Sequence, residues 1–304
     1  MAKFVMTKKR ALEIAQAAGA GDSAKVIELL RQINNTNIGY KALRRGTWKY
    51  YAEKLAQWIE QGMPEDTPFS VWNLDGNNKL PFASFSTLPG VTCPGAGACW
   101  FVDNVAGAGY CYTVKSWRYP TALFRQVQNT LLIKSPKGRK LITKKTLELP
   151  NGIDCRLYVD GDFDSLLTVT YWFVLLRSRP DLRVYGYSKS WQLLLDYASK
   201  RAPKIGWPDN YLLNLSNGAS AEHLRAQVSR LPIVRGDFIA VEIDKKLKGK
   251  YNTPEYRSAV RNAGIDAGIK KAFVCPGKCG ECTKSGHFCG RSDTKQIPVL
   301  IGVH

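Results

Sequence analysis

The stretch RLYVDGDFDSLLTVTYWFVLLRSRPDLRVYGYSKS, which runs from Arg156 to Ser190, decides the fold class of this chain. Short apolar runs predict strands over Arg156–Val159 and Arg183–Tyr187, and the apolar pattern between them predicts a helix over Leu166–Arg177. A strand, a helix and a second strand in this order are typical of a parallel sheet that is covered by helices.

The same alternation continues on both sides of this stretch. Further strands are predicted over Leu80–Ser86, Tyr211–Leu215 and Phe238–Ile243, and further helices over Trp191–Ser199 and Ala221–Ser229. We therefore expect an α/β fold in the form of a complete or partial (β/α) barrel, which fits this order better than an open doubly wound sheet does.

The beginning of the chain has a different, helical pattern. Apolar residues at helical spacing predict a helix over Ala11–Ile33, broken by a turn at Gly19–Gly21, and a second helix over Ala42–Gly62. The chain is therefore expected to divide into a basic helical extension, residues 1–63, and a barrel-like catalytic domain, residues 64–304, which carries a cysteine-rich segment at 275–289.

The charge of the chain predicts a polyanionic partner. The 304 residues include 44 Lys and Arg against 25 Asp and Glu, a formal net charge of +19, while 44% hydrophobic and 23% charged residues exclude wholesale disorder. Cationic side chains bind phosphates and aromatic side chains stack on unpaired bases, so we expect a nucleic acid, DNA or RNA, as partner; a solvated basic surface is the alternative. The expected contacts are Arg44, Arg45, Trp48, Lys49, Lys137, Arg139 and Lys140.

Two observations bear on membranes and location. No apolar run reaches the roughly 20 residues that span a bilayer, and the first residues lack the apolar core of a secretory signal. The sequence therefore predicts a cytoplasmic protein with no membrane partner.

Polar side chains follow four of the predicted strands at the point where each strand ends. They are Asp160, Asp162 and Asp164, then Ser188 and Lys189, then Ser216 and Asn217, and finally Asp244. Because the chemistry of a (β/α) barrel takes place where its strands end, we expect the site there. The alternative is that the three aspartates form a capping cluster for the helix that begins at Leu166.

Four cysteines near the end of the chain have the spacing of a metal site. They are Cys275, Cys279, Cys282 and Cys289, in the Gly-rich CPGKCGECTKSGHFCG, and His287 could replace one of them. Such a thiolate set suits zinc, or alternatively a 4Fe–4S cluster. A redox dithiol pair is the remaining reading.

A second group, Cys93, Cys99 and Cys111, follows the first predicted strand of the barrel. Three cysteines without an obvious fourth fit an open-coordinated cluster, or a metal ion completed by Cys155 or a water molecule. They also fit unligated core cysteines, which are common.

Several motifs, taken together and in order, resemble the phage "gene product 88" family. They are ASFSTLPGVTCPG (Ala83–Gly95), Cys111–Tyr112, YVDGDFDS (Tyr158–Ser165), YGYSKS (Tyr185–Ser190), LNLSNG (Leu213–Gly218), CGEC (Cys279–Cys282) and the terminal Val303–His304. The resemblance covers roughly residues 70–304, and the spacing of the Cys93 group departs from the more compact pattern of that family. It implies a phage-type gene whose product works in the host cytoplasm.

More remotely, the architecture is similar to that of phage DNA 7-deazaguanine transglycosylases, which are zinc-containing (β/α) barrels. This similarity implies a transferase that exchanges guanine in DNA for a 7-deazaguanine base. Such an exchange needs a nucleophile at C1′, an acid or base for the purine and polar groups for the base edge.

The strand-end residues supply groups for this reaction. Asp162 is the first choice as nucleophile, with Asp160 beside it and Asp244 as candidate partner. The expected substrate-binding residues are Ser86, Asp164, Tyr187, Ser188, Lys189, Asn214, Ser216, Asn217 and Glu242. Among them, Tyr187 would stack on the base and Asn214, Ser216 and Asn217 would bind its edge.

Two other functions stay open. Cys275–Cys282 also matches the C-x3-C-x2-C spacing of radical S-adenosylmethionine enzymes, although in those enzymes the motif lies near the first barrel strand. That reading predicts an iron–sulfur enzyme acting on nucleic acid. The third reading is a non-catalytic DNA-binding protein with a structural metal.

Overall fold

The N-terminal helices form as the residue pattern predicts. The computed structural model describes residues 7–33, 47–74, 80–103, 105–247, 249–280, 282–283 and 287–303. Helix α1 (Lys8–Gly19) begins after Thr7, and α2 (Ser23–Arg31) begins after Asp22; both of these side chains accept a hydrogen bond from a backbone N–H of the first turn. Helix α3 (Thr47–Glu60) follows, and residues 42–46 of its predicted range lie outside the described part.

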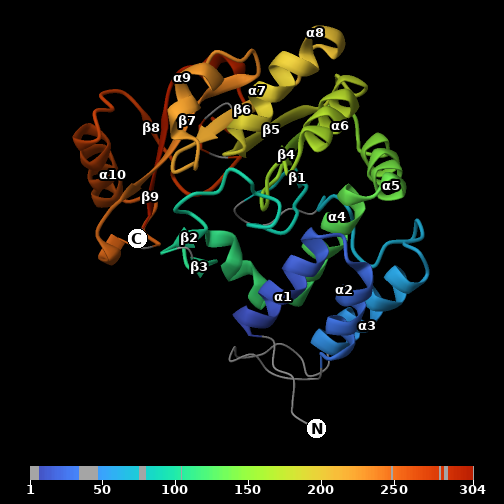
Figure 1. The fold of residues 1–304 in the computed structure, drawn as a ribbon. Helices are drawn as coiled ribbons and strands as arrows, with labels where there is room; N and C mark the ends of the chain where they lie inside the picture. Colours follow the sequence, from blue (N-terminus) through green and yellow to red (C-terminus); the bar gives the residue numbers. More distant parts are fainter. Residues whose placement is uncertain are drawn as a thin grey trace.

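Seven strands form one sheet (Figure 1). Their order is β1 (Ala83–Ser84), β4 (Asp154–Leu157), β5 (Arg183–Ser188), β6 (Tyr211–Ser216), β7 (Val234–Glu242), β9 (Val299–Val303) and β8 (Phe273–Val274). Every pairing in this sheet is parallel. A separate hairpin consists of β2 (Phe101–Val102) and β3 (Val105–Ala106).

Helical segments separate most successive strands of the sheet. They are η1 (Tyr112–Arg118), α4 (Pro120–Lys134), α5 (Pro136–Leu147), α6 (Leu166–Arg177), α7 (Trp191–Lys200), α8 (Ala202–Ile205), η2 (Glu222–Leu224), α9 (Arg225–Val228), η3 (Lys245–Leu247), α10 (Pro254–Asp266) and η4 (Ser292–Thr294). In Figure 1, α6 to α9 line the upper side of the sheet and α1 to α3 lie below it. The α/β class is thus confirmed.

Closure of the sheet into a complete barrel is not shown. The five strands β1, β4, β5, β6 and β7 are neighbours in the order in which they follow one another along the chain. Strand β9 then inserts between β7 and β8, and in the described residues no pairing joins β8 to β1. The sheet therefore has two edges.

The two faces of the sheet differ in character. Leu157, Val184, Leu213 and Leu215 belong to one buried apolar cluster together with side chains of α4, α6 and α7. Because successive side chains of a strand point to opposite faces, the residues that alternate with these leucines and valines share the other face. We call this second face the polar face: Arg156, Tyr185, Tyr187, Asn214 and Ser216.

The N-terminal helices are part of the same packed body as the sheet. Helices α1 and α3 both pack against α4. Their buried residues belong to the same cluster as those of the sheet, and the ring of Trp48 meets the ring of Phe124 at 5.5 Å. None of the described helices is both long and apolar enough to cross a membrane.

Candidate functional site at the carboxyl edge of the sheet

The segment after β1 crosses the ends of the neighbouring strands. We call residues 85–111 the edge loop. A Cβ atom on Gly95 would collide with the carbonyl of Lys189 after β5, and one on Gly97 would lie 2.7 Å from the carbonyl of Gly218 after β6. Only glycine allows backbones to approach so closely, so the composition of the edge loop fixes its place over the carboxyl edge.

Asp162 is held by the backbone of that edge. Its two carboxylate oxygens accept hydrogen bonds from the N–H groups of Phe163, at 2.7 Å, and Lys189, at 2.8 Å, and the Ser188 hydroxyl donates to the same group. Burial raises the pKa of Asp162 to about 6 against the effect of these donors. Asp162 therefore links the end of β4 to the end of β5.

Asp160 lies beside it with fewer partners. It accepts a hydrogen bond from the Gln126 amide of α4 at 2.8 Å and another from the Ser86 hydroxyl. Burial raises the pKa of Asp160 to about 6, and the guanidinium of Arg156 opposes that rise. Unlike Asp162, which is 5% exposed, Asp160 keeps part of its surface in contact with solvent.

Asp164 serves the helix that follows. It forms an ion pair with Lys134 at 2.5 Å and accepts a hydrogen bond from the Thr168 hydroxyl, while Ser165 caps the N-terminus of α6. The helix is thus capped by Ser165 and not by an aspartate, and the expected contact of Asp164 with substrate has no support in its geometry.

The structure does not bring Asp244 and Glu242 to these aspartates. Both are exposed residues at the end of β7. Asp162 is hydrogen-bonded to the backbone of Lys189 at the end of β5, and β7 is two positions from β5 in the sheet, about 10 Å at the usual strand spacing. The expectation that Asp244 partners Asp162 is wrong, because the order of strands in the sheet separates them.

Lys189 is a half-buried cation at the same edge. Its ammonium group donates to the carbonyl of Asn217. Burial lowers the pKa of Lys189, and the nearby thiol of Cys99 and carboxyl of Asp162 oppose that decrease. An amine, a carboxyl group and a thiol thus share one small volume.

Most residues expected to bind a base edge are occupied by the fold. The Asn214 amide donates to the carbonyls of Gly186 and Cys289 and accepts from Arg235. The Asn217 amide exchanges two hydrogen bonds with the backbone of Ala240. Both amides therefore bridge strands, and only the half-buried Ser216 keeps its expected role as a prediction.

The ring of Tyr187 already has neighbours on the polar face. The guanidinium of Arg156 lies 4.5 Å from its centroid and the ring of Phe238 lies at 4.7 Å, edge to face. A base that stacks on Tyr187 would have to displace Arg156, whose cation is attracted by the ring.

The C-terminal cysteines gather against the polar face. The pKa of Cys275 is raised to about 12 and that of Cys289 to about 11. Burial is the main cause of both increases, and the other thiols of the group contribute to them. The Tyr187 hydroxyl bonds to Cys289, and the thiols of Cys279 and Cys289 act electrostatically on Tyr185. Within the described ranges, no three His, Cys, Asp or Glu side chains are arranged to hold a metal ion, so the zinc site stays a prediction.

His287 is an aromatic spacer in this segment. It is 8% exposed, and its ring lies 4.6 Å from that of Phe82 and 4.7 Å from that of Tyr185. Burial lowers the pKa of His287.

The first cysteine group lies in the edge loop itself. The backbone N–H of Cys111 donates to the carbonyl of Cys99 at 2.7 Å, and burial followed by the charge of Asp162 raises the pKa of Cys93. Cys155 is not their fourth member. The charged groups that act on it are Asp154, Arg179, Asp181 and Arg183, at the opposite, amino end of the strands.

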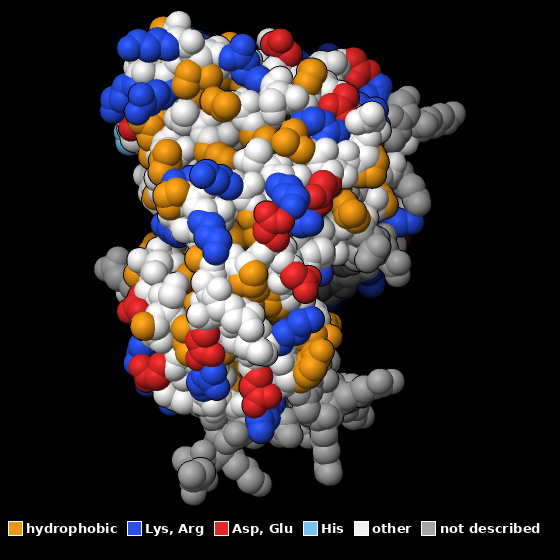
Figure 2. Space-filling view, turned by 90° about the vertical axis from the view of Figure 1, so that its right-hand side faces the viewer, with side chains coloured by type: hydrophobic (Ala, Val, Ile, Leu, Met, Phe, Trp, Pro, Cys, Tyr) orange, Lys and Arg blue, Asp and Glu red, His pale blue; other side chains and the backbone are white. Residues whose placement is uncertain are grey.

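The residues predicted to contact DNA differ in exposure and in their partners within the fold. Trp48 is wrong as a stacking residue, because it is 4% exposed and packs in the core. Lys49 pairs with Glu53 at 3.5 Å, Lys137 donates to the carbonyl of Gly62 and Arg139 to that of Ile133, whereas Lys140 is exposed. Arg44 and Arg45 lie outside the described residues. On the side of the molecule seen in Figure 2, Lys and Arg side chains are spread widely with acidic ones among them.

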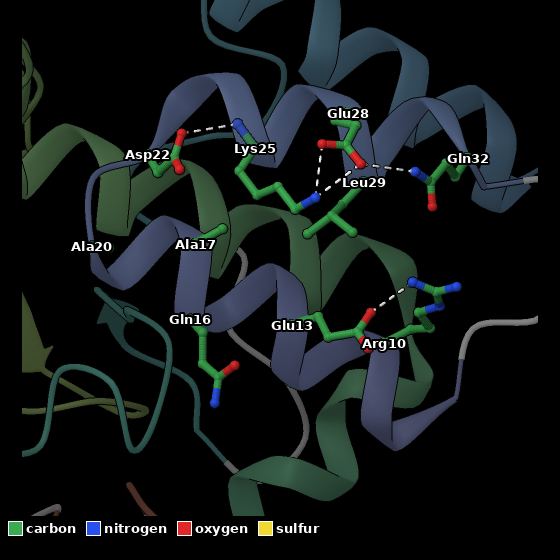
Figure 3. A pocket seen from close by; sticks show the side chains of 10 residues that line it. All are labelled: Arg10, Glu13, Gln16, Ala17, Ala20, Asp22, Lys25, Glu28, Leu29 and Gln32. Atoms are coloured by element: carbon green, nitrogen blue, oxygen red, sulfur yellow. Dashed lines mark hydrogen bonds and ion pairs between the residues drawn. The ribbon is translucent and has the colours of Figure 1, made fainter.

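A groove between α1 and α2 lies apart from these residues (Figure 3). Its volume is about 450 Å³, and two ion pairs line it, Arg10 with Glu13 and Lys25 with Glu28. Exposed pairs of this kind contribute little to stability. None of the lining residues belongs to the carboxyl edge.

Three residues of the site are missing from the sequence-based expectations. Arg156 and Tyr185 are on the polar face, and Gln126 lies in α4, a helix that the pattern did not predict. The sequence contains one signal for Arg156, a charged residue between two apolar ones, Cys155 and Leu157. In the structure these two neighbours are fully buried, in a strand of four residues. A charged residue at an alternating position indicates a face that is not apolar core.

The comparisons with known proteins name a family. The family model described as Gene product 88 matches residues 46–293, whereas no curated protein and no solved structure matches the chain. The remote similarity to transglycosylases is thus a prediction still. The matched range begins before the expected residue 70 and includes α3, the edge loop, both cysteine groups and the site aspartates. This chain therefore belongs to the gene product 88 family.

Proposed function

We propose that this protein is a DNA-modifying transferase that exchanges guanine for a 7-deazaguanine base at the carboxyl edge of its sheet. The observation that carries the proposal is the pair of carboxyl groups there, Asp160 and Asp162, whose pKa values burial raises to about 6. The net charge of +19 supports a DNA substrate. The strand order from β1 to β7 supports the barrel architecture by analogy of fold.

Glycosyl exchange by this route requires a carboxylate nucleophile with a free lone pair. The bond from C1′ to the purine nitrogen breaks as a bond from C1′ to the carboxylate oxygen forms, and the leaving base takes up a proton. The incoming base then loses a proton and displaces the carboxylate from C1′. The exchange is redox neutral and needs no further reactant.

The hydrogen bonds favour Asp160 over Asp162 as that carboxylate. Asp162 is buried, and two backbone N–H groups and the Ser188 hydroxyl fix both of its oxygens. The carboxylate of Asp160 accepts side-chain hydrogen bonds from Ser86 and Gln126, and it is still in contact with solvent. We assign the nucleophile to Asp160 and a positioning role to Asp162, which reverses the order expected from the sequence.

The test is a single substitution followed by nucleoside mass spectrometry. We expect Asp160→Asn to abolish incorporation of the modified base into DNA, with DNA affinity unchanged and the protein still folded. Asp209→Asn, which lies outside the site in the loop between α8 and β6, is the matched control and should retain full incorporation. Incorporation by Asp160→Asn would contradict the assignment. Absence of any modified nucleoside with the wild-type protein would contradict the function.

Zinc is proposed at the C-terminal cysteines. Cys275, Cys279, Cys282 and Cys289 would supply four thiol donors, and each thiol of the group that has a raised pKa is influenced by others of the same group, although the described structure does not arrange three of them around one ion. Zinc bound there would stabilise the segment that covers the polar face, and no step of the exchange is assigned to it. Zinc analysis of the purified protein should give one ion per chain, as expected for a single site with four thiolate ligands.

One observation favours a second function, an iron–sulfur enzyme that acts on nucleic acid. Cys93, Cys99 and Cys111 follow the first strand of the sheet and lie beside Asp162 and Lys189 at the carboxyl edge. Three thiols with an open position suit a 4Fe–4S cluster. Purification without oxygen separates the two proposals, since a brown protein containing iron supports the second, and a colourless protein free of iron excludes it.

A further inference from the structure

The β2–β3 hairpin exposes an apolar tip to solvent. Phe101 is 42% exposed, Val102 48% and Val105 60%. Asp103, in the turn, has a φ of 47°, in the left-handed region that two-residue hairpin turns require. Apolar side chains that gather at a protruding turn do not contribute to the core and are typical of a contact surface.

The tip is firmly attached to the carboxyl edge. Below it, the N–H of Gly109 donates to the carbonyl of Trp100 at 3.2 Å, and the N–H of Cys111 donates to that of Cys99 at 2.7 Å. Trp100 is 4% exposed and packs against Trp117 at 6.3 Å. The hairpin is therefore a rigid extension of the edge loop, whose Cys99 acts electrostatically on Lys189.

Cations lie at the base of the hairpin and follow it in the sequence. The Lys8 ammonium group donates to the carbonyl of Gly107, which ties α1 to the hairpin. Helix η1 directly after the hairpin carries the exposed Lys115 and Arg118, and the Arg118 guanidinium lies 4.9 Å from the ring centroid of Tyr119, which is 45% exposed. From Phe101 to Tyr119 the sequence has one acidic residue, Asp103.

We propose that the β2–β3 hairpin inserts between the bases of a nucleic acid and unstacks a base for the carboxyl edge. Apolar wedges that enter a base step beside phosphate-binding cations are a general means of opening a stack. The charge of these flanking residues, like the net charge of +19, favours a polyanion over an apolar protein as occupant, and a nucleic acid is the polyanion that also offers base steps to apolar side chains. This inference rests on the proposed function, because it supplies the base on which that function acts.

The experiment measures unstacking without chemistry. A short DNA duplex with one 2-aminopurine becomes more fluorescent when that base leaves the stack. The test variant is Phe101→Ser/Val102→Ser/Val105→Ser. The matched control is Leu167→Ser/Val174→Ser/Ile265→Ser, three apolar residues that are 57%, 49% and 58% exposed on α6 and α10.

We expect the wild-type protein and the control variant to raise the fluorescence, and the hairpin variant to bind without raising it. Loss of base stacking should weaken the Kd about tenfold, with the salt dependence of binding unchanged. All three proteins should melt at the same temperature, since the substituted side chains are exposed.

Three results would overturn the inference. They are a hairpin variant that still raises the fluorescence, a wild-type protein that binds DNA without raising it, and self-association of the wild-type protein that the hairpin variant abolishes. Failure of the proposed function is recognised separately: unstacking that depends on the hairpin, together with no modified nucleoside, retains the wedge and rejects the transferase.

Discussion

The two cysteine groups of this molecule lie in different surroundings on one sheet. Cys93, Cys99 and Cys111 lie in the edge loop, where the neighbouring ionisable groups are Asp162 and Lys189. The C-terminal group lies against the polar face, where its neighbours are Tyr185, Tyr187 and Arg235. The same residue type therefore lies in two environments: the first group lies among ionisable side chains at the carboxyl edge, and the second belongs to a segment that covers buried polar side chains.

The largest expected effect is a loss of stability at Arg235, which tests how the C-terminal cysteine segment is held against the polar face. Arg235 is fully buried and donates to Asn214 Oδ1 and to the carbonyls of Thr294, Ile297 and Asp237. Arg235→Met removes all these donors and leaves buried acceptors unsatisfied, so the free energy of unfolding should fall by about 4 kcal/mol. Denaturant unfolding measures this loss.

Lys295→Met is the matched control, because Lys295 is exposed and has one long hydrogen bond, of 3.5 Å, to the carbonyl of Pro232. Its unfolding free energy should stay within about 0.5 kcal/mol of that of the wild type. Equal stabilities of the two variants would show that the C-terminal segment is not held to the polar face by Arg235.

The next effect concerns pH and the carboxyl edge. The pKa of Asp162 is raised to about 6 in the folded protein by burial, above its value in an unfolded chain. A raised pKa means that the folded state binds the proton more tightly, so the contribution of Asp162 to stability is largest below its unfolded pKa of about 4 and is lost as the pH rises through about 6.

Asp162 should account for a decrease of about 3 kcal/mol between pH 4 and 7, and Asp162→Asn should remove that part of the slope. Thermal unfolding of both proteins across this range measures it, with Asp209→Asn as the control that keeps the wild-type slope. An Asp162→Asn variant whose stability changes with pH as steeply as that of the wild type would contradict the burial of an ionisable Asp162.

The smallest effect tests the edge loop. Cys99→Ser replaces a half-buried thiol in a loop, outside the strands of the sheet. The unfolding free energy should therefore change by less than about 1 kcal/mol. Cys289→Ser, in the segment that Asn214 and Arg235 hold, should cost about 2 kcal/mol. A larger loss for Cys99→Ser than for Cys289→Ser would reverse the comparison.

Local pattern determined much of the fold. The strands Arg183–Tyr187 and Tyr211–Leu215 and the helices Leu166–Arg177 and Trp191–Ser199 were predicted within a residue of β5, β6, α6 and α7. The expected break at Gly19–Gly21 is confirmed between α1 and α2. Runs of this kind are decided by side-chain periodicity and caps, which act over a few residues.

Other helices and strands could not be predicted from the local sequence pattern. Helices α4 and α5 and strands β8 and β9 were not predicted, and the strand expected over Leu80–Ser86 shortens to Ala83–Ser84. In α4 the buried positions include Gln126, Gln128 and Asn129. Polar residues in a buried helix interrupt the apolar period, and only their partners elsewhere in the chain make them stable there.

The site shows the same division. The sequence by itself determined that small and acidic residues follow the strands, that cysteines form two groups and that the chain is strongly basic. Only the tertiary structure decided that Asp162 braces the edge, that Asn214 and Asn217 are used by the fold and that Trp48 and Cys155 lie elsewhere. The reason is physical: periodicity fixes the face on which a side chain stands, whereas its partner comes from the order of strands and the path of distant loops.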